Sequence, residues 1–175
     1  MKFFLLFGFL IFILVSTNAQ SSENADSHKK NSQHILHHNH AAVFLGGTTF
    51  FKKGESHFSV GLDYVYRPNV EEPWAFSIFG EAIFAEHTEY LIGLPVYYSF
   101  NNIWWLRAGP GIEIIQEEEH HGDEVETKTE VEFLFRFGVG VPFHLGNFGI
   151  TPTIDFDLVR NHDAIVWGIN FGYGF

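Results

Sequence analysis

The sequence predicts an all-β fold: an eight-stranded antiparallel transmembrane up-and-down β-barrel. From Ala41 to Phe175, eight segments alternate large apolar residues with small or polar ones, the two-residue period of a β-strand. The apolar face is rich in Phe, Trp and Tyr, whereas the other face carries much of the glycine. A narrow barrel needs small residues inside and lipid accepts aromatic ones outside, so we place the apolar face outward. A soluble lipocalin-like barrel would reverse the faces and leave the glycines in water, where nothing requires them.

The first 40 residues lie outside the predicted barrel. Lys2 precedes an unbroken run of 13 apolar or glycine residues, Phe3 to Val15, and the small residues Thr17 and Ala19 fit a signal-peptidase site. A helix of 13 residues spans about 20 Å, less than the roughly 30 Å of a hydrocarbon core. We therefore interpret 1–19 as a cleaved signal peptide rather than a membrane helix. Residues 20–40, rich in Ser, Asn, Lys and His, are predicted to form a disordered tail.

The barrel itself is expected to occupy 41–175. Its strands are predicted at residues 41–51, 58–66, 74–84, 90–100, 102–116, 131–144, 148–158 and 164–175. The phase of the first strand stays open, because Val43 and Leu45, with Phe51, suit one face whereas Phe44 and Phe50 suit the other.

Four prolines fall inside the predicted strands. Proline has no backbone N–H to donate to a neighbouring strand, and a closed barrel has no free edge at which this loss would be harmless. Pro95, Pro142 and Pro152 lie near predicted turns, where a bulge costs little. Pro110 lies in mid-strand, and the alternation gives no reason for it.

Turn lengths predict the orientation. Tight turns are expected at Asn101-Asn102 and Gly146-Asn147, and the longest connection is expected from Glu117 to Lys128. Barrels in outer membranes have short periplasmic turns and longer external loops. These lengths place the N-terminal tail in the periplasm. Aromatic residues gather at the predicted periplasmic strand ends, as in a membrane-interface belt: Tyr66, Trp74, Tyr98, Phe100, Trp104, Phe143, Phe148, Tyr173 and Phe175.

The clearest alternation is the run Trp167-Gly-Ile-Asn-Phe-Gly-Tyr-Gly-Phe175. With this run, the segment 41–175 resembles the small outer-membrane β-barrel superfamily, which includes barrels like outer-membrane proteins A and X. The resemblance implies a bacterial, Gram-negative outer membrane as location and its lipid as surroundings. It also implies that the barrel-assembly machinery reads an insertion signal formed by Trp167, Ile169, Phe171, Tyr173 and Phe175. It implies no particular activity, because barrels of this kind host several.

Charged residues on the inward face are expected to pair with one another across a filled lumen. The proposed network comprises Arg107, Arg136, Glu81, Glu113, Asp155 and Asp157. Asp63, Arg67, Glu89 and Glu132 also face inward. Arg136 pairs with Asp155 if the turn is Leu145-Gly146, and with Asp157 if it is Gly146-Asn147. The alternative is that these charges line a path for ions, but the interior of an eight-stranded barrel leaves little room for one.

Histidine is unusually frequent, at 11 residues. Five histidines fall near the predicted external loops and, with Glu117 to Glu119, form a hypothetical weak divalent-metal site: His57, His87, His120, His121 and His162. His57 and Ser59 share a strand face, but no acid partner is evident and we assign no catalytic residue.

The remaining composition excludes some functions. A net charge of -11 repels phosphate backbones, so no nucleic-acid partner is expected. Cysteine is absent, which excludes disulfides and thiolate metal sites. The favoured function is a non-enzymatic envelope barrel whose external loops contact ligands or surfaces. The alternatives are a divalent-metal-binding barrel and a lipid A-modifying enzyme. The sequence leaves the oligomeric state open.

Overall fold

The computed structural model describes residues 37–100, 103–121 and 124–175, and it describes no side chain from 117 to 127. The predicted signal peptide and most of the predicted tail lie outside these residues. The described strands are β1 (Asn39–Phe50), β2 (Glu55–Tyr66), β3 (Trp74–Phe84), β4 (Thr88–Gly93), β5 (Val96–Phe100), β6 (Trp104–His121), β7 (Glu124–Gly140), β8 (Phe143–Leu145), β9 (Phe148–Val159) and β10 (Asp163–Gly174). None of the described residues forms a helix long and apolar enough to cross a membrane.

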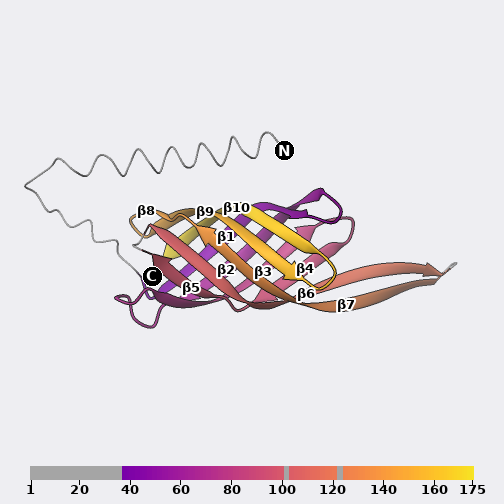
Figure 1. The fold of residues 1–175 in the computed structure, drawn as a ribbon, viewed down its shortest axis with the longest axis horizontal. Coiled ribbons are helices and arrows are strands. Elements are labelled where there is room, and N and C mark those ends of the chain that lie inside the picture. Colours follow the sequence, from indigo (N-terminus) through magenta and orange to yellow (C-terminus); the bar gives the residue numbers. More distant parts are fainter. Residues whose placement is uncertain (1–36, 101–102, 122–123) are drawn as a thin grey trace, which may run out of the picture. The chain divides into compact units, whose positions relative to one another are not determined.

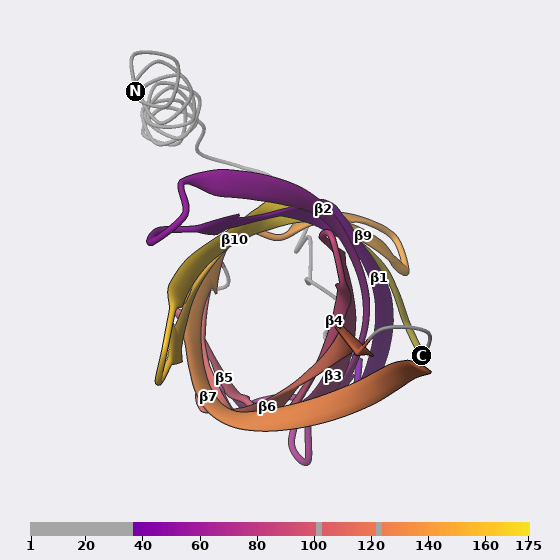
Figure 2. The same ribbon diagram turned by 90° about the vertical axis from the view of Figure 1, so that its right-hand side faces the viewer.

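The strands close into an antiparallel ring (Figures 1 and 2). β4 and β5 follow one another along the same neighbours, β3 and β6, and so act as one interrupted strand. β7 and β8 do the same beside β9. The ring therefore has eight members and closes where β1 pairs with β10, from His40 opposite Gly174 to Phe50 opposite Ala164. This confirms the predicted eight-stranded barrel.

The two faces of the strands separate as the alternation predicts. In β1, Val43 and Leu45 point outward with 42% and 43% exposure, whereas Phe44 and Phe50 are buried inside, which settles the phase of this strand. Large apolar side chains are exposed on every one of the eight ring members. A soluble protein does not present such a continuous apolar exterior to water, but a lipid bilayer covers it.

The barrel has two distinct ends. Asn39 and Phe175 lie at one, which we call the terminal end, where the backbone N–H of each donates to the carbonyl of the other at 3.1 and 2.9 Å. This pairing adds the last two residues of the predicted tail to the barrel, so it begins at Asn39 rather than Ala41. The connections at the terminal end are 67–73, 101–103 and 146–147. Gly146 adopts a φ of 64°, which a non-glycine residue tolerates poorly, and forms the two-residue turn with Asn147.

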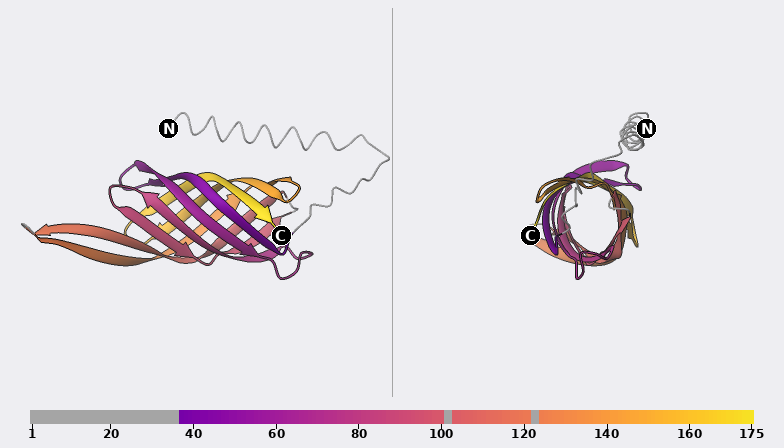
Figure 3. Two further views of the ribbon diagram at one scale, coloured as in Figure 1. Left: turned by 180° about the vertical axis from the view of Figure 1, so that it is seen from behind. Right: turned by 90° about the vertical axis from the view of Figure 1, so that its left-hand side faces the viewer.

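The opposite end carries a long β-hairpin, and we call it the hairpin end (Figures 1 and 3). β6 and β7 remain paired from Trp105 opposite Gly140 out to His121 opposite Glu124. The long connection expected from Glu117 to Lys128 is therefore shorter in the structure, because 117–121 and 124–128 are paired strand. The sequence conceals this because these residues do not alternate apolar with polar side chains.

The strand interruptions account for two of the four prolines. Pro95 and Pro142 occupy the gaps between β4 and β5 and between β7 and β8. Pro110 lies within β6, where its carbonyl still accepts a hydrogen bond from the Leu94 N–H at 2.9 Å, so only one ladder bond is lost. Its neighbour Gly109 allows the two strands to approach closely, because a Cβ there would lie 2.6 Å from the Leu94 carbonyl oxygen and closer still to the Pro95 Cα.

Candidate functional site

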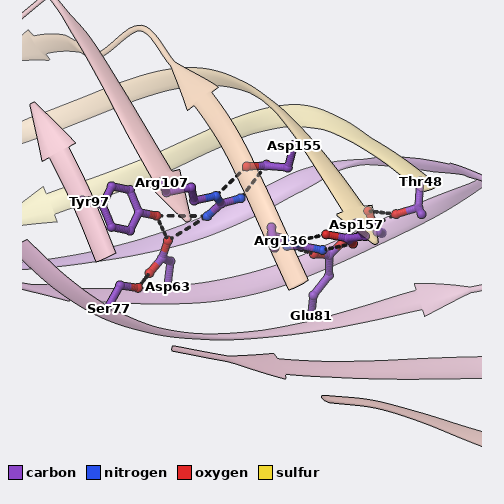
Figure 4. Close-up of polar contacts among 10 residues, drawn as sticks. Thr48, Asp63, Ser77, Glu81, Tyr97, Arg107, Arg136, Asp155 and Asp157 are labelled. Atoms are coloured by element: carbon purple, nitrogen blue, oxygen red, sulfur yellow. Dashed lines mark hydrogen bonds and ion pairs between the residues drawn. The ribbon is translucent and has the colours of Figure 1, made fainter. Parts of the chain in front are cut away.

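The lumen holds a buried ion cluster centred on Arg136 of β7 (Figure 4). Its Nε and Nη2 each donate to one oxygen of Asp157 on β9, both at 2.6 Å. Its Nη1 donates to Glu81 on β3 at 2.6 Å, and Thr48 of β1 donates to the other Glu81 oxygen at 3.4 Å. Arg136, Glu81 and Asp157 are all buried. Because a buried charge without a partner is costly, the cluster fixes four strands around one guanidinium.

A second cluster surrounds Arg107 of β6 (Figure 4). Its Nε and Nη2 donate to the two oxygens of Asp155 at 2.6 and 2.5 Å. Its Nη1 donates to Asp63 at 3.2 Å and to the Tyr97 hydroxyl at 3.0 Å. Tyr97 and Ser77 in turn donate to Asp63. Thus five strands contribute to this network, and each of the three nitrogens of both guanidinium groups donates at least one hydrogen bond.

Small and apolar residues complete the filling of the lumen. Phe79 lies against both guanidinium groups, with its ring centroid 4.4 Å from Cζ of Arg136 and 5.8 Å from Cζ of Arg107. Gly138 is opposite Asp155 in the ladder, and a Cβ there would collide with the Asp155 carboxylate. A buried apolar layer adjoins the Arg136 cluster and consists of Phe50, Phe79, Ile83, Leu91, Leu134, Val159 and Ala164. In the structure, inward charges thus pair across the lumen, Arg136 with Asp157 and Glu81, and Arg107 with Asp155 and Asp63.

One member of the predicted network lies elsewhere. Glu113 is 1% exposed but contacts neither arginine in the described part of the chain. Its Oε2 lies 3.0 Å from Nε2 of His162, in the 160–162 connection at the hairpin end. Glu89 of β4 joins them, with one ligand atom from each of the three residues within 4.8 Å of the others. We call Glu89, Glu113 and His162 the rim cluster. Leu91 lies between Glu81 and Glu113 in the ladder, which explains the separation from Arg136.

The rim cluster affects the protonation of its histidine. The contact with the Glu113 carboxylate raises the pKa of His162 above its ordinary 6.5, and this effect outweighs the opposing effect of partial burial. The imidazole is thus held in its charged form over a wider pH range. At the terminal end, burial lowers the pKa of Arg67 from its ordinary value.

The five histidines proposed as a metal site are not brought together among the described side chains. His162 is in the rim cluster, whereas His57 lies 3.7 Å from Glu55 and His87 is exposed in the 85–87 connection. His120 and His121 are at the tip of the hairpin, and their side chains lie outside the described part. Sequence reasoning missed Glu89 and Glu113 as partners of His162. Both glutamates are predicted to face inward near the end of the barrel that carries His162, and this could have indicated the contact.

The Ser59 and His57 pair does not form a catalytic arrangement. Ser59 is fully buried in the lumen, where its Oγ accepts a hydrogen bond from Thr48 at 3.4 Å. His57 instead lies against the Phe50 ring, with centroids 5.8 Å apart. A serine nucleophile needs an adjacent base and access to substrate, and Ser59 has neither among the described residues.

A cavity of about 120 Å³ opens at the terminal end. Its lining includes His37, His40 and Arg67, with Asp63 and Tyr97 at the base. His40 comes from the segment predicted to be a disordered tail, and its ring fills the space left by Gly172. Because Asp63 and Tyr97 belong to the Arg107 network, the cavity reaches that network from the terminal end.

These features define an eight-stranded transmembrane-type β-barrel with an ionic, filled interior. Solved structures that share the fold include the N-terminal β-barrel domain of OprF from Pseudomonas aeruginosa, at 14% identity and a TM-score of 0.56, covering 79% of this chain and 99% of that one. They also include the attachment invasion locus protein Ail of Yersinia pestis, at 14% identity and a TM-score of 0.57, covering 78% and 96% of the two chains. Neisserial surface protein A matches at 14% identity and a TM-score of 0.52, with the same coverages of 78% and 96%. This chain has the fold of these small outer-membrane β-barrels. No protein-family model and no curated protein sequence matches it.

Proposed function

We propose that this protein is a non-enzymatic barrel of the bacterial outer membrane, with a periplasmic terminal end, whose β6–β7 hairpin contacts a basic surface outside the cell. The observation that carries this proposal is the hairpin itself. It continues as paired backbone to His121 and Glu124, well beyond the ends of neighbouring strands (Figure 3). A paired ribbon presents its tip at a fixed distance from the membrane, which suits contact with another surface.

Three further features support the proposal. The exterior carries exposed apolar side chains around the ring, which suits lipid. The exposed aromatic residues Trp74, Phe100 and Tyr173 lie at the terminal end, as expected for an interface belt. The segment that closes the hairpin is strongly acidic in sequence, from Glu117 to Glu126, which favours a basic partner.

The test replaces residues 117–128 by a two-residue Asn-Gly turn, which joins Gln116 to Thr129 and keeps the native ladder pairs from Gln116 opposite Thr129 inward. The shortened barrel should still migrate as a folded species on unboiled gels. In zwitterionic detergent it should bind immobilised polylysine more weakly than the full chain. The control changes Glu71 and Glu72, two exposed acidic residues at the terminal end, to Gln. An equal loss of binding per negative charge removed in the control and in the shortened barrel would attribute the effect to net charge and refute a role for the hairpin.

A second measurement addresses the absence of enzymatic activity. The lumen offers no nucleophile with a histidine and an acid beside it among the described residues, and Ser59 is sealed from lipid. Mass spectra of lipid A from cells with and without the protein should therefore be identical. A species that loses or gains an acyl chain only when the protein is present would contradict this part of the proposal.

A further inference from the structure

We infer that the rim cluster is a binding site for a divalent transition-metal ion of the zinc type, with Glu89, Glu113 and His162 as its protein ligands. The inference is independent of the proposed contact made by the hairpin. It rests on the position of three ligand atoms, on their lack of other partners and on the local excess of negative charge.

The geometry suits a single ion. Oε2 of Glu113 and Nε2 of His162 lie 3.0 Å apart. A tetrahedral ion about 2.1 Å from two ligands separates them by about 3.4 Å, so this pair needs only a small adjustment. The Glu89 oxygen lies within 4.8 Å of both atoms, a distance that a rotation of its flexible side chain can shorten. The three residues come from β4, β6 and the 160–162 connection, which the closed ring holds at one mouth.

The ligand atoms are otherwise unused. Glu89 Oε2, Glu113 Oε2 and His162 Nε2 are buried atoms without a hydrogen-bond partner among the described residues. The Glu113 side chain is 2% exposed, so its charge cannot be solvated by bulk water. Buried carboxylates elsewhere in the lumen behave differently, because Asp155 and Asp157 each hold an arginine through two hydrogen bonds. A buried carboxylate that faces one partly exposed imidazole and a second carboxylate, with no arginine beside it among the described residues, is an arrangement that a cation stabilises.

The surroundings reinforce the demand for positive charge. Glu132 lies opposite Glu113 in the ladder and leaves its Oε2 without a described partner, while its Oε1 accepts from Asn161. The apolar layer with Leu91 and Leu134 separates the rim cluster from Arg136. Lys53 is the described lysine that interacts electrostatically with Glu89, and its side chain is exposed on the 51–54 turn.

The donor types select the class of ion. One imidazole and two carboxylates suit zinc and its neighbours, whereas calcium and magnesium prefer sites built from oxygen alone. Three protein ligands leave a coordination position open. Because Glu89 and His162 are only partly buried, water can reach the ion from the hairpin end.

The test is a calorimetric titration of zinc into the full chain refolded in zwitterionic detergent. Glu113→Gln and His162→Gln should each remove one binding site or weaken it more than about ten-fold. Lys53→Gln should tighten the same site, because it removes a competing positive charge. Histidine is a common zinc ligand, so His57→Gln and His87→Gln serve as matched controls for histidines outside the cluster and should leave this site unchanged.

A second readout reports the ligands directly. Cobalt(II) in the site should give visible absorption bands that Glu113→Gln and His162→Gln remove and that His87→Gln retains. Each variant is first checked for heat-modifiable migration. If Glu113→Gln does not fold, Glu89→Gln and His162→Gln, which change partly exposed residues, carry the test. Zinc stoichiometry and cobalt spectra that are the same in wild type and in the folded rim variants would overturn the inference.

Discussion

Arg136 and Asp157 lie directly opposite each other on β7 and β9, joined by two parallel hydrogen bonds of 2.6 Å. The two-residue turn at Gly146 and Asn147 sets this register. It places Leu145 opposite Phe148, and all the pairs between β7–β8 and β9, including Arg136 with Asp157, continue in the same register. A turn one residue earlier would have paired Arg136 with Asp155, which instead holds Arg107. A local turn thus decides which carboxylate neutralises which guanidinium at the centre of the barrel.

Arg136→Ala should strongly destabilise the barrel, because it leaves Asp157 and Glu81 buried without a cation. The expected loss in the free energy of unfolding is about 3–5 kcal/mol, measured by urea titration in detergent. The matched control is Arg160→Ala, since Arg160 is exposed beyond β9. Similar losses in the two variants would show that the buried cluster contributes no more than a surface charge.

The filled lumen should exclude ions. Arg107, Arg136 and the apolar layer with Leu134 together occupy the interior between the terminal-end cavity and the hairpin end. We expect planar bilayers containing the folded chain to show no steady single-channel conductance. Large, stable conductance steps that require the folded protein would contradict a closed barrel.

Gly109→Ala should impair folding, because its Cβ would collide with the backbone of Leu94 and Pro95. Such overpacking costs about 1–3 kcal/mol, seen as a lower urea midpoint. Gly80→Ala is the control, since the nearest atom to a Cβ there is the Leu91 carbonyl oxygen at 4.0 Å. If both substitutions shift the midpoint equally, the close approach at Gly109 is not the cause.

His162 should make stability depend on pH. Its contact with Glu113 raises its pKa above the ordinary 6.5, so the folded state holds the proton more tightly than the unfolded state. This contribution to stability is complete below the unfolded pKa and is lost as pH rises through the folded pKa. Urea midpoints of wild type and His162→Gln, measured with a chelator present, should differ most at the acidic side of this range. A difference that grows with rising pH would reverse the assigned sign.

Phe175→Gln should reduce insertion by the assembly machinery in cells, because Phe175 ends the outward row that the resemblance identifies as an insertion signal. The hydrogen bonds between residue 175 and Asn39 are made by the backbone and remain possible in the variant, so the substitution should not affect closure of the ring. Phe148→Gln is the control, being exposed at the same end. The readout is the heat-modifiable fraction in membranes. Equal insertion of the two variants would refute a special role for Phe175.

Much of the fold could be predicted from the sequence, because period-two alternation of side chains reports the faces of a strand directly. The inward placement of Arg107, Arg136 and Asp157 follows from that period alone. The strand interruptions coincide with Pro95 and Pro142, whose missing donors are visible in the sequence. The hairpin beyond Glu117 was not predictable in this way, because its residues do not alternate apolar with polar side chains.

The sequence by itself determined that eight outward apolar faces would form a ring around a charged interior. Only the tertiary structure decided which charges meet. Glu113 was expected beside the arginines, yet it lies at the hairpin end with His162 and Glu89. The physical reason is that alternation specifies a side chain's direction but not its height in the barrel. That height depends on the register and stagger between neighbouring strands, which emerge only when the ring closes.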